Sequence, residues 1–184
     1  MKLIKEEILK QDVSFFNDEL KTFPYLNGNG EHYKLLKYIS FLYDNKIMLD
    51  LGTACGHSAL ALAQNKSNRI ITYDLNKRSN LLDNVENIKR VLLDCNLMSN
   101  DVIEFSKIIL LDIDPHNGIQ EIKFYNKLKQ TKFKGILLCD DINLNQNMKN
   151  FWNQITEEKY DISDLGHLSG TGLVNFSDEK IEIE

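Results

Sequence analysis

Short apolar runs that end at an aspartate, or one residue past it, recur along the chain and constrain its fold more than any other feature. The clearest runs span residues 47–51, 69–74, 107–112 and 135–140. Unbroken apolar runs of this length are typical of strands covered on both faces, as in a parallel sheet. Between them lie stretches with helical spacing, such as 58–64 and 118–130. The alternation predicts an α/β fold with a doubly wound parallel sheet and crossover helices.

The aspartates of these runs are Asp50, Asp74, Asp112 and Asp140. Ligands of a doubly wound sheet bind at the carboxyl ends of its strands. One aspartate at a strand end decides little, because such residues also cap turns. Four together are hard to explain by solubility alone, and they predict a polar ligand site at this edge.

The rest of the chain completes a single domain over residues 1–184. We expect a weaker strand at 91–94, a helix at 145–157 and two closing strands at 160–165 and 172–176. Residues 3–23 have the spacing of one or two amphipathic helices, and 31–43 of another. The predicted organisation is N-terminal helices or a lid in 1–45 and a Rossmann-like core in 46–177.

Composition narrows the function classes. The formal charge of −5 disfavours a broad basic surface for nucleic acid, and no apolar stretch approaches the length of a membrane span. The three cysteines, Cys55, Cys95 and Cys139, are odd in number and lie in or beside apolar runs, as expected for thiols in a reducing compartment. The first residues lack the apolar centre of a signal peptide. We therefore expect a cytoplasmic protein without membrane or nucleic-acid partners.

Residues 50–58, Asp-Leu-Gly-Thr-Ala-Cys-Gly-His-Ser, join the first strand to its helix. Gly52 allows a tight turn, Gly56 allows close approach of backbone to a ligand, and Ser58 is a candidate helix cap. Asp74 follows Asp50 by 24 residues, close to the offset at which an acid meets ribose hydroxyls. This pattern predicts a nucleoside site. It is not GxGxxG, so it does not by itself separate one nucleoside from another.

The run from Asp50 to Ala63 resembles motif I of class I S-adenosylmethionine-dependent methyltransferases, and GTxxGxSALALA is closest to small-molecule O-methyltransferases. The resemblance implies a seven-stranded sheet with a central first strand and an antiparallel last strand. It also implies S-adenosylmethionine as cofactor, with Gly52 and its neighbours at the amino-acid half and Asp74 on the ribose. Asp94 matches the position near adenine only loosely. The expected cofactor-binding residues are Asp50, Gly52, Thr53, Ala54, Gly56, Ser58, Asp74, Asp94 and Asp112.

Acids also gather after two neighbouring strands. Asp112 follows the fourth strand, and Asp140 and Asp141 follow the fifth. Three hard oxygen ligands suit Mg²⁺, Mn²⁺ or Ca²⁺ better than zinc. We therefore predict a divalent-metal site at Asp112, Asp140 and Asp141, which would hold and orient a substrate hydroxyl.

This acid pattern is similar to that of metal-dependent O-methyltransferases of the catechol and caffeoyl-CoA type. Asp141 stands where an asparagine is usual, and Pro115 replaces the usual lysine. His116 resembles the base of metal-dependent sugar O-methyltransferases, and histidine suits proton transfer near neutral pH. The resemblance implies methyl transfer to a small-molecule hydroxyl, on a sugar or glycan in preference to a catechol, with His116 and Asp112 as catalytic residues.

Other interpretations stay open. The acids could bind substrate in a metal-free methyltransferase, and the chain could be a nucleotide-binding oxidoreductase or a non-catalytic cofactor-binding subunit. Neither GxGxxG nor a Tyr-x-x-x-Lys pair supports the oxidoreductase. The glycine-rich loop with His167 and Ser169 opens on the same edge or is a simple hairpin turn, and residues 27–33 form a lid or a linker. A homodimer and fusion to a larger enzyme are both compatible with the sequence.

Overall fold

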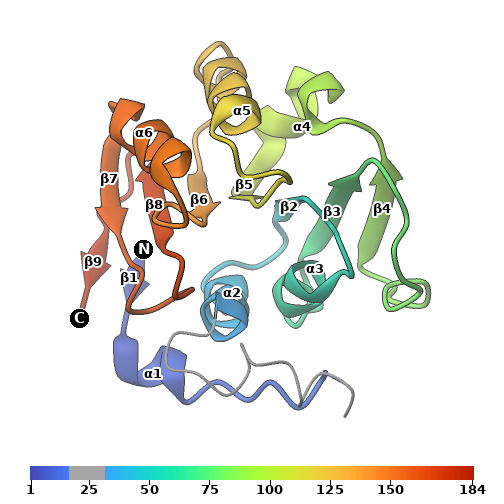
Figure 1. Ribbon diagram of the computed structural model, residues 1–184. Helices are drawn as coiled ribbons and strands as arrows, with labels where there is room; N and C mark the ends of the chain where they lie inside the picture. Colours follow the sequence, from blue (N-terminus) through green and yellow to red (C-terminus); the bar gives the residue numbers. More distant parts are fainter. Residues whose placement is uncertain (17–31) are drawn as a thin grey trace.

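A computed structural model describes residues 1–16 and 32–184. In these residues seven strands form one sheet in the order β4-β3-β2-β5-β6-β8-β7 (Figure 1). β8 is antiparallel to both neighbours, and the pairs from β4 to β6 are parallel. The predicted fold, a mostly parallel seven-stranded sheet with an antiparallel closing strand, is confirmed. The strands are β2 (Ile47–Leu51), β3 (Arg69–Asp74), β4 (Ile88–Leu92), β5 (Ser106–Leu111), β6 (Ile136–Asp140), β7 (Glu158–Asp161) and β8 (Thr171–Asn175).

Helices cover both faces of the sheet (Figure 1). Along each central strand successive side chains point to opposite faces, so Met48 joins one hydrophobic core and Leu49 the other. Burial on both sides explains why these strands are continuously apolar. One core packs beneath α1 (Lys5–Leu9), α2 (His32–Phe41) and α3 (His57–Leu62), and the other beneath α4 (Asn100–Phe105), α5 (Ile119–Lys129) and α6 (Gln146–Gln154).

The strand order reverses between β2 and β5. β3 and β4 extend the sheet on one side of β2, whereas β5 and β6 extend it on the other. The loops that leave β2 and β5 therefore diverge and leave a crevice at the carboxyl edge, which is the usual ligand position in such sheets. Topology alone thus places the loops after Leu51 and Leu111 at a binding site.

The two ends of the described chain pair with each other. β1 (Lys2–Leu3) runs parallel to β9 (Glu182–Ile183), and the Lys5 amide donates to the Glu184 carbonyl at 2.7 Å. The sequence did not indicate this two-stranded sheet, because two-residue strands leave no hydropathy pattern. It brings the first and last residues together beside α1 (Figure 1).

Two local expectations need correction. The third strand spans Ile88–Leu92 rather than 91–94, because the Asp94 carboxylate caps a 3₁₀ turn at Cys95–Leu97. Within residues 3–16 only Lys5–Leu9 is α-helical, and residues 17–23 lie outside the described part, as does most of the segment proposed as a lid. The short helix α4 was not expected.

No helix among the described residues combines the length and the apolar character that a membrane span requires.

Candidate active site at the carboxyl edge of the sheet

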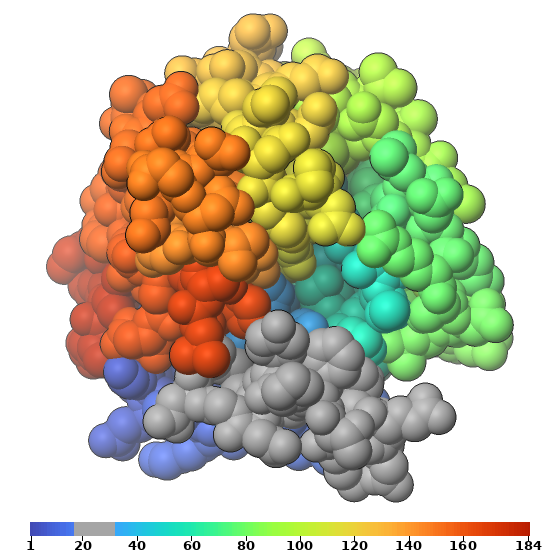
Figure 2. Space-filling model, viewed as in Figure 1, coloured from blue at the N-terminus to red at the C-terminus, as the bar shows by residue number. Residues whose placement is uncertain are grey.

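A cavity of about 720 Å³ opens at the carboxyl edge, between the loops that follow β2, β3, β4 and β5. Figure 2 shows this hollow in the face turned to the viewer, bordered by green and yellow atoms. Five of the nine predicted cofactor-binding residues line it: Gly52, Ala54, Asp74, Asp94 and Asp112. The predicted base His116 lines it as well. The structure therefore brings these residues, from four separate loops, around one space.

Gly52 lets the loop after β2 pass against the end of β5. Its φ is +101°, and a Cβ atom built there would lie 1.6 Å from the Asp112 carbonyl oxygen. The Asp112 amide donates to the Leu51 carbonyl at 2.9 Å, which holds the two loops together. Only glycine fits this backbone and this contact.

Three predicted residues lie beneath this loop and do not line the cavity. The Asp50 carboxylate is fully buried and accepts hydrogen bonds from the hydroxyls of Thr72 and Ser58. The Thr53 hydroxyl pairs with that of Thr72. Burial raises the pKa of Asp50. Asp50, Thr53 and Ser58 thus support the shape of the loop from below.

Gly56 begins α3 in the left-handed region, with φ of +97°. It is the N-cap residue, and no side chain caps this helix. The expectation that Ser58 caps the helix is therefore wrong, since Ser58 lies inside α3 and is turned toward Asp50. Gly56 does not line the cavity; a Cβ there would meet the side chain of Leu82.

Asp74 and Asp94 are fixed by backbone amides at the cavity wall. The Asp74 carboxylate accepts from the Ala54 amide at 2.8 Å and from the Asn76 amide at 3.0 Å. Asp94 accepts from the Asn96 amide at 2.8 Å. Amide donors hold each carboxylate in one orientation, so these acids are preorganised to accept hydrogen bonds from a ligand.

The predicted acid cluster does assemble at the ends of β5 and β6. Burial raises the pKa of Asp112, and the nearby charge of Asp140 raises it further. Asp140 is only 5% exposed, and no described residue makes a hydrogen bond to its Oδ1. Burial raises the pKa of Asp141, but hydrogen bonds from His167 and Ser169 and the charges of His116 and His167 together outweigh it, so the pKa is lowered. The edge therefore holds two neighbouring carboxyl groups, Asp112 and Asp140, and one hydrogen-bonded carboxylate, Asp141.

His116 lies between these acids. Its Nε2 is 3.8 Å from Asp112 Oδ1 and 3.5 Å from Asp114 Oδ1, and its Nδ1 is 3.5 Å from Asp141 Oδ2. The side-chain amide of Asn145 donates to the backbone carbonyl of His116 at 2.9 Å, and the His116 backbone adopts a φ of +49°. The loop after β5 thus holds the imidazole between the cavity and the acid cluster.

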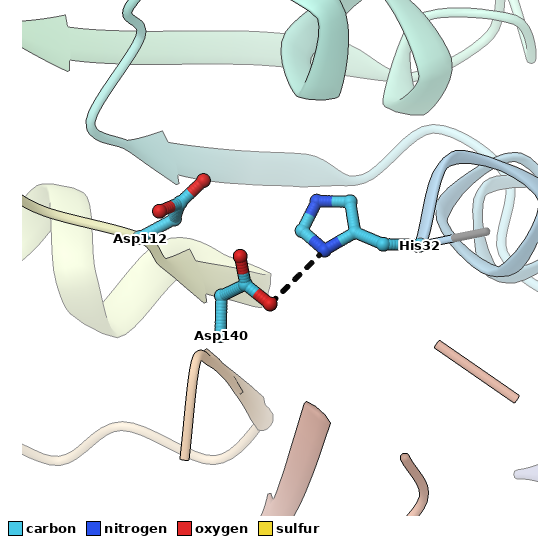
Figure 3. Close-up of side chains that lie close together, drawn as sticks. All are labelled: His32, Asp112 and Asp140. Atoms are coloured by element: carbon cyan, nitrogen blue, oxygen red, sulfur yellow. Dashed lines mark ion pairs between the residues drawn. The ribbon is translucent and has the colours of Figure 1, made fainter. Parts of the chain in front are cut away.

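Two further histidines complete the cluster. His32, the first residue of α2, points at the acids, with Nδ1 3.4 Å from Asp140 Oδ1 (Figure 3). Nδ1 of His167 is 3.3 Å from Asp141 Oδ1. Burial lowers the pKa of His32, but the contact with Asp140 and the negative charges of Asp140, Asp112 and Asp50 together more than offset this and raise it to about 9.

Sequence reasoning assigned no chemistry to His32 and only a position to His167. The only signal in the sequence was the small number of histidines. The chain has four, and the structure brings three of them together at this edge. Their convergence depends on α2 and on the loop between β7 and β8. No spacing rule links these segments to the strands that carry the aspartates.

Comparison with known proteins was made by sequence and by structure. No protein-family model matches the chain, and no curated protein sequence matches it. Solved structures do match. The S-adenosylhomocysteine-bound methyltransferase PaMTH1 of Podospora anserina superposes with a TM-score of 0.61 at 13% identity, over 91% of this chain and 100% of that one. This chain has the class I methyltransferase fold.

Two other structures show how widely this methyltransferase fold is used. The O-methyltransferase TomG of Streptomyces achromogenes, solved with S-adenosylmethionine, matches at a TM-score of 0.58 and 15% identity, over 79% of each chain. An rRNA methylase of Streptococcus thermophilus matches at 0.54 and 12% identity, over 77% of this chain and 93% of that one. Since both share the fold, the acceptor has to be argued from the site.

Proposed function

We propose that this chain is an S-adenosylmethionine-dependent O-methyltransferase that methylates a hydroxyl of a small molecule, on a sugar or glycan in preference to a catechol. One observation carries the proposal. Asp112 and His116, on the same loop, line the cavity expected to hold the cofactor and also belong to the cluster of acids and histidines. A methyl donor in the cavity and a hydroxyl at the cluster would therefore meet on this loop.

The proposed reaction is a direct displacement. The acceptor oxygen attacks the methyl carbon of the sulfonium, and the S–CH₃ bond breaks with its electron pair left on sulfur, giving S-adenosylhomocysteine. The hydroxyl proton passes to the imidazole of His116, which Asp112, Asp114 and Asp141 then stabilise as a cation. Most of the rate enhancement would come from holding oxygen, carbon and sulfur in line.

A divalent cation fits the acid edge. The donor set is hard, and the buried Asp140 Oδ1 has ion-pair contacts but accepts no hydrogen bond among the described residues. We propose that Asp112 and Asp140 hold the ion, with Asp141 beside them. When bound, Mg²⁺ or Mn²⁺ would supply positive charge that favours the ionised hydroxyl.

Calorimetry and a transfer assay test the function. S-adenosylhomocysteine should bind with micromolar affinity or better, and NAD⁺ should not bind. Formation of S-adenosylhomocysteine from S-adenosylmethionine would then be followed with sugars and catechols, in Mg²⁺, in Mn²⁺ and in chelator.

Two results would overturn the proposal. Binding of NAD⁺ but not S-adenosylhomocysteine would favour the oxidoreductase. Cofactor binding without turnover, on any acceptor and with either metal, would favour a non-catalytic subunit. Full activity in chelator would reject the role of the metal and leave the methyltransferase proposal standing.

A further inference from the structure

The first residue of α2 reaches the acid edge from a different layer of the molecule. Figure 3 shows the His32 ring extending from its helix toward the carboxyl groups of Asp112 and Asp140. Donor atoms of these three residues all lie within 4.8 Å of one another. His32 is 6% exposed, so its imidazole is held inside the protein and aimed at the pair.

A second observation points to a ligand at this position. Asp140 is more than nine-tenths buried, and within the part of the chain that the structure describes its Oδ1 accepts no hydrogen bond, although His32 Nδ1 is 3.4 Å away. A buried carboxylate oxygen that accepts no hydrogen bond is costly, and a cation between it and the imidazole would coordinate both.

Asp141 is the weaker candidate for the same ion. Its carboxylate already accepts hydrogen bonds from His167 and Ser169, and its Oδ2 is 3.5 Å from His116 Nδ1. A carboxylate with these partners would lose them on binding a metal. Oxygens of Asp140 and Asp112 lie 3.4–3.8 Å from imidazole nitrogens, and Oδ1 of Asp140 accepts no hydrogen bond from the described residues.

We propose that His32 is the third protein ligand of the divalent cation, with Asp112 and Asp140, and that its imidazole makes the site prefer Mn²⁺ to Mg²⁺. The inference rests on the metal site proposed above and specifies it. Mg²⁺ is bound almost entirely by oxygen, whereas a mixed imidazole and carboxylate set suits first-row transition ions. In this arrangement Asp141 orients His116 and His167 and does not bind the ion.

Direct metal binding tests the assignment without any turnover. The full-length protein would be freed of metal with chelator, and Mn²⁺ and Mg²⁺ would be titrated by calorimetry, with free Mn²⁺ counted by EPR. Pulsed EPR of the Mn²⁺ complex should show coupling to an imidazole ¹⁴N. In His32→Ala, Mn²⁺ affinity should fall at least 10-fold, Mg²⁺ affinity less than 3-fold, and the nitrogen coupling should disappear.

His167→Ala is the matched control, because Nδ1 of His167 is 3.7 Å from the same Asp140 oxygen. It should keep the nitrogen coupling and bind Mn²⁺ within 3-fold of the parent. His32→Gln provides a second, polar variant. Binding of S-adenosylhomocysteine by each variant shows that the fold and the cofactor site are intact.

Three outcomes would overturn the inference. Nitrogen coupling that persists in both His32 variants would assign the ligand elsewhere. Tighter Mn²⁺ binding by His32→Ala would mean that His32 is a counter-cation occupying the place of the metal. If the parent protein binds S-adenosylhomocysteine but not Mn²⁺, the metal site is rejected and the methyltransferase proposal stands. If the parent protein does not bind S-adenosylhomocysteine, the methyltransferase proposal is rejected separately.

Discussion

Replacement of Gly52 by alanine isolates the contact that brings the loops after β2 and β5 together. The new Cβ would lie 1.6 Å from the Asp112 carbonyl oxygen, far inside any van der Waals contact, and the backbone sits at φ +101°. Gly56 offers a matched comparison at φ +97°, where the nearest atom to a new Cβ is Leu82 Cγ at 2.7 Å. The two sites share the backbone strain and differ in whether the obstacle can move.

The magnitudes follow from these two terms. A non-glycine residue at positive φ costs about 1–2 kcal/mol. Leu82 can shift by changing rotamer, so Gly56→Ala should lose about 2 kcal/mol of the free energy of unfolding. At Gly52 the obstacle is backbone hydrogen-bonded into the sheet edge, and its displacement adds about 2–3 kcal/mol. We expect Gly52→Ala to lose ~4 kcal/mol in all.

Urea denaturation and calorimetry with S-adenosylhomocysteine measure both effects. Gly52→Ala should unfold at clearly lower urea than Gly56→Ala, with similar m-values, and should bind the ligand at least 10-fold more weakly than the parent. Equal stability losses for the two variants would refute the reasoning. So would unchanged ligand affinity in Gly52→Ala, because the displaced loops line the cavity.

Three further predictions concern the site. Asp74→Ala should weaken S-adenosylhomocysteine binding at least 10-fold by calorimetry, whereas the exposed Asp101→Ala should not change it. His116→Ala should lower kcat ~10²–10⁴-fold with ligand affinity within 3-fold of the parent, and full turnover would exclude it as the base. The pKa of His32 is raised to about 9, so its contribution to stability is complete below about pH 6.5 and is lost as pH rises toward 9. Urea denaturation of metal-free protein should show a loss of up to ~3 kcal/mol in the free energy of unfolding over this pH range, and His32→Gln should abolish it. The same dependence of unfolding free energy on pH in the variant would contradict the assignment.

Much of the cavity wall was predictable, because its residues follow strands whose continuous apolar character is visible in the sequence. Asp74 and Asp112 come directly after or at the end of buried apolar runs, and parallel strands deliver their carboxyl ends to one edge. Gly52 was expected at a tight turn, and its contact with the Asp112 carbonyl supplies the reason. Which side chains face the cavity was not predictable, since Asp50 and Thr53 bond beneath the loop instead.

The histidines show where sequence reasoning stopped. His116 was found because it shares a loop with Asp112. His32 lies 108 positions before Asp140 and approaches from α2, and the packing of α2 against α3 and the sheet decides where it points. The short β1–β9 pair was not predicted for a similar reason, because two-residue strands far apart in the sequence carry no local hydropathy pattern.

The sequence by itself determined the central strands of the sheet, the helices that follow β2, β5 and β6, and the four aspartates at strand ends, because apolar periodicity and strand direction are local properties. The tertiary structure decided which acids accept hydrogen bonds and which histidines meet them. Those outcomes depend on contacts between segments far apart in the chain, where burial, hydrogen bonding and charge are set jointly by several elements. The buried Asp140 carboxylate that faces His32 is such an outcome, and it makes a row of acids a specific candidate metal site.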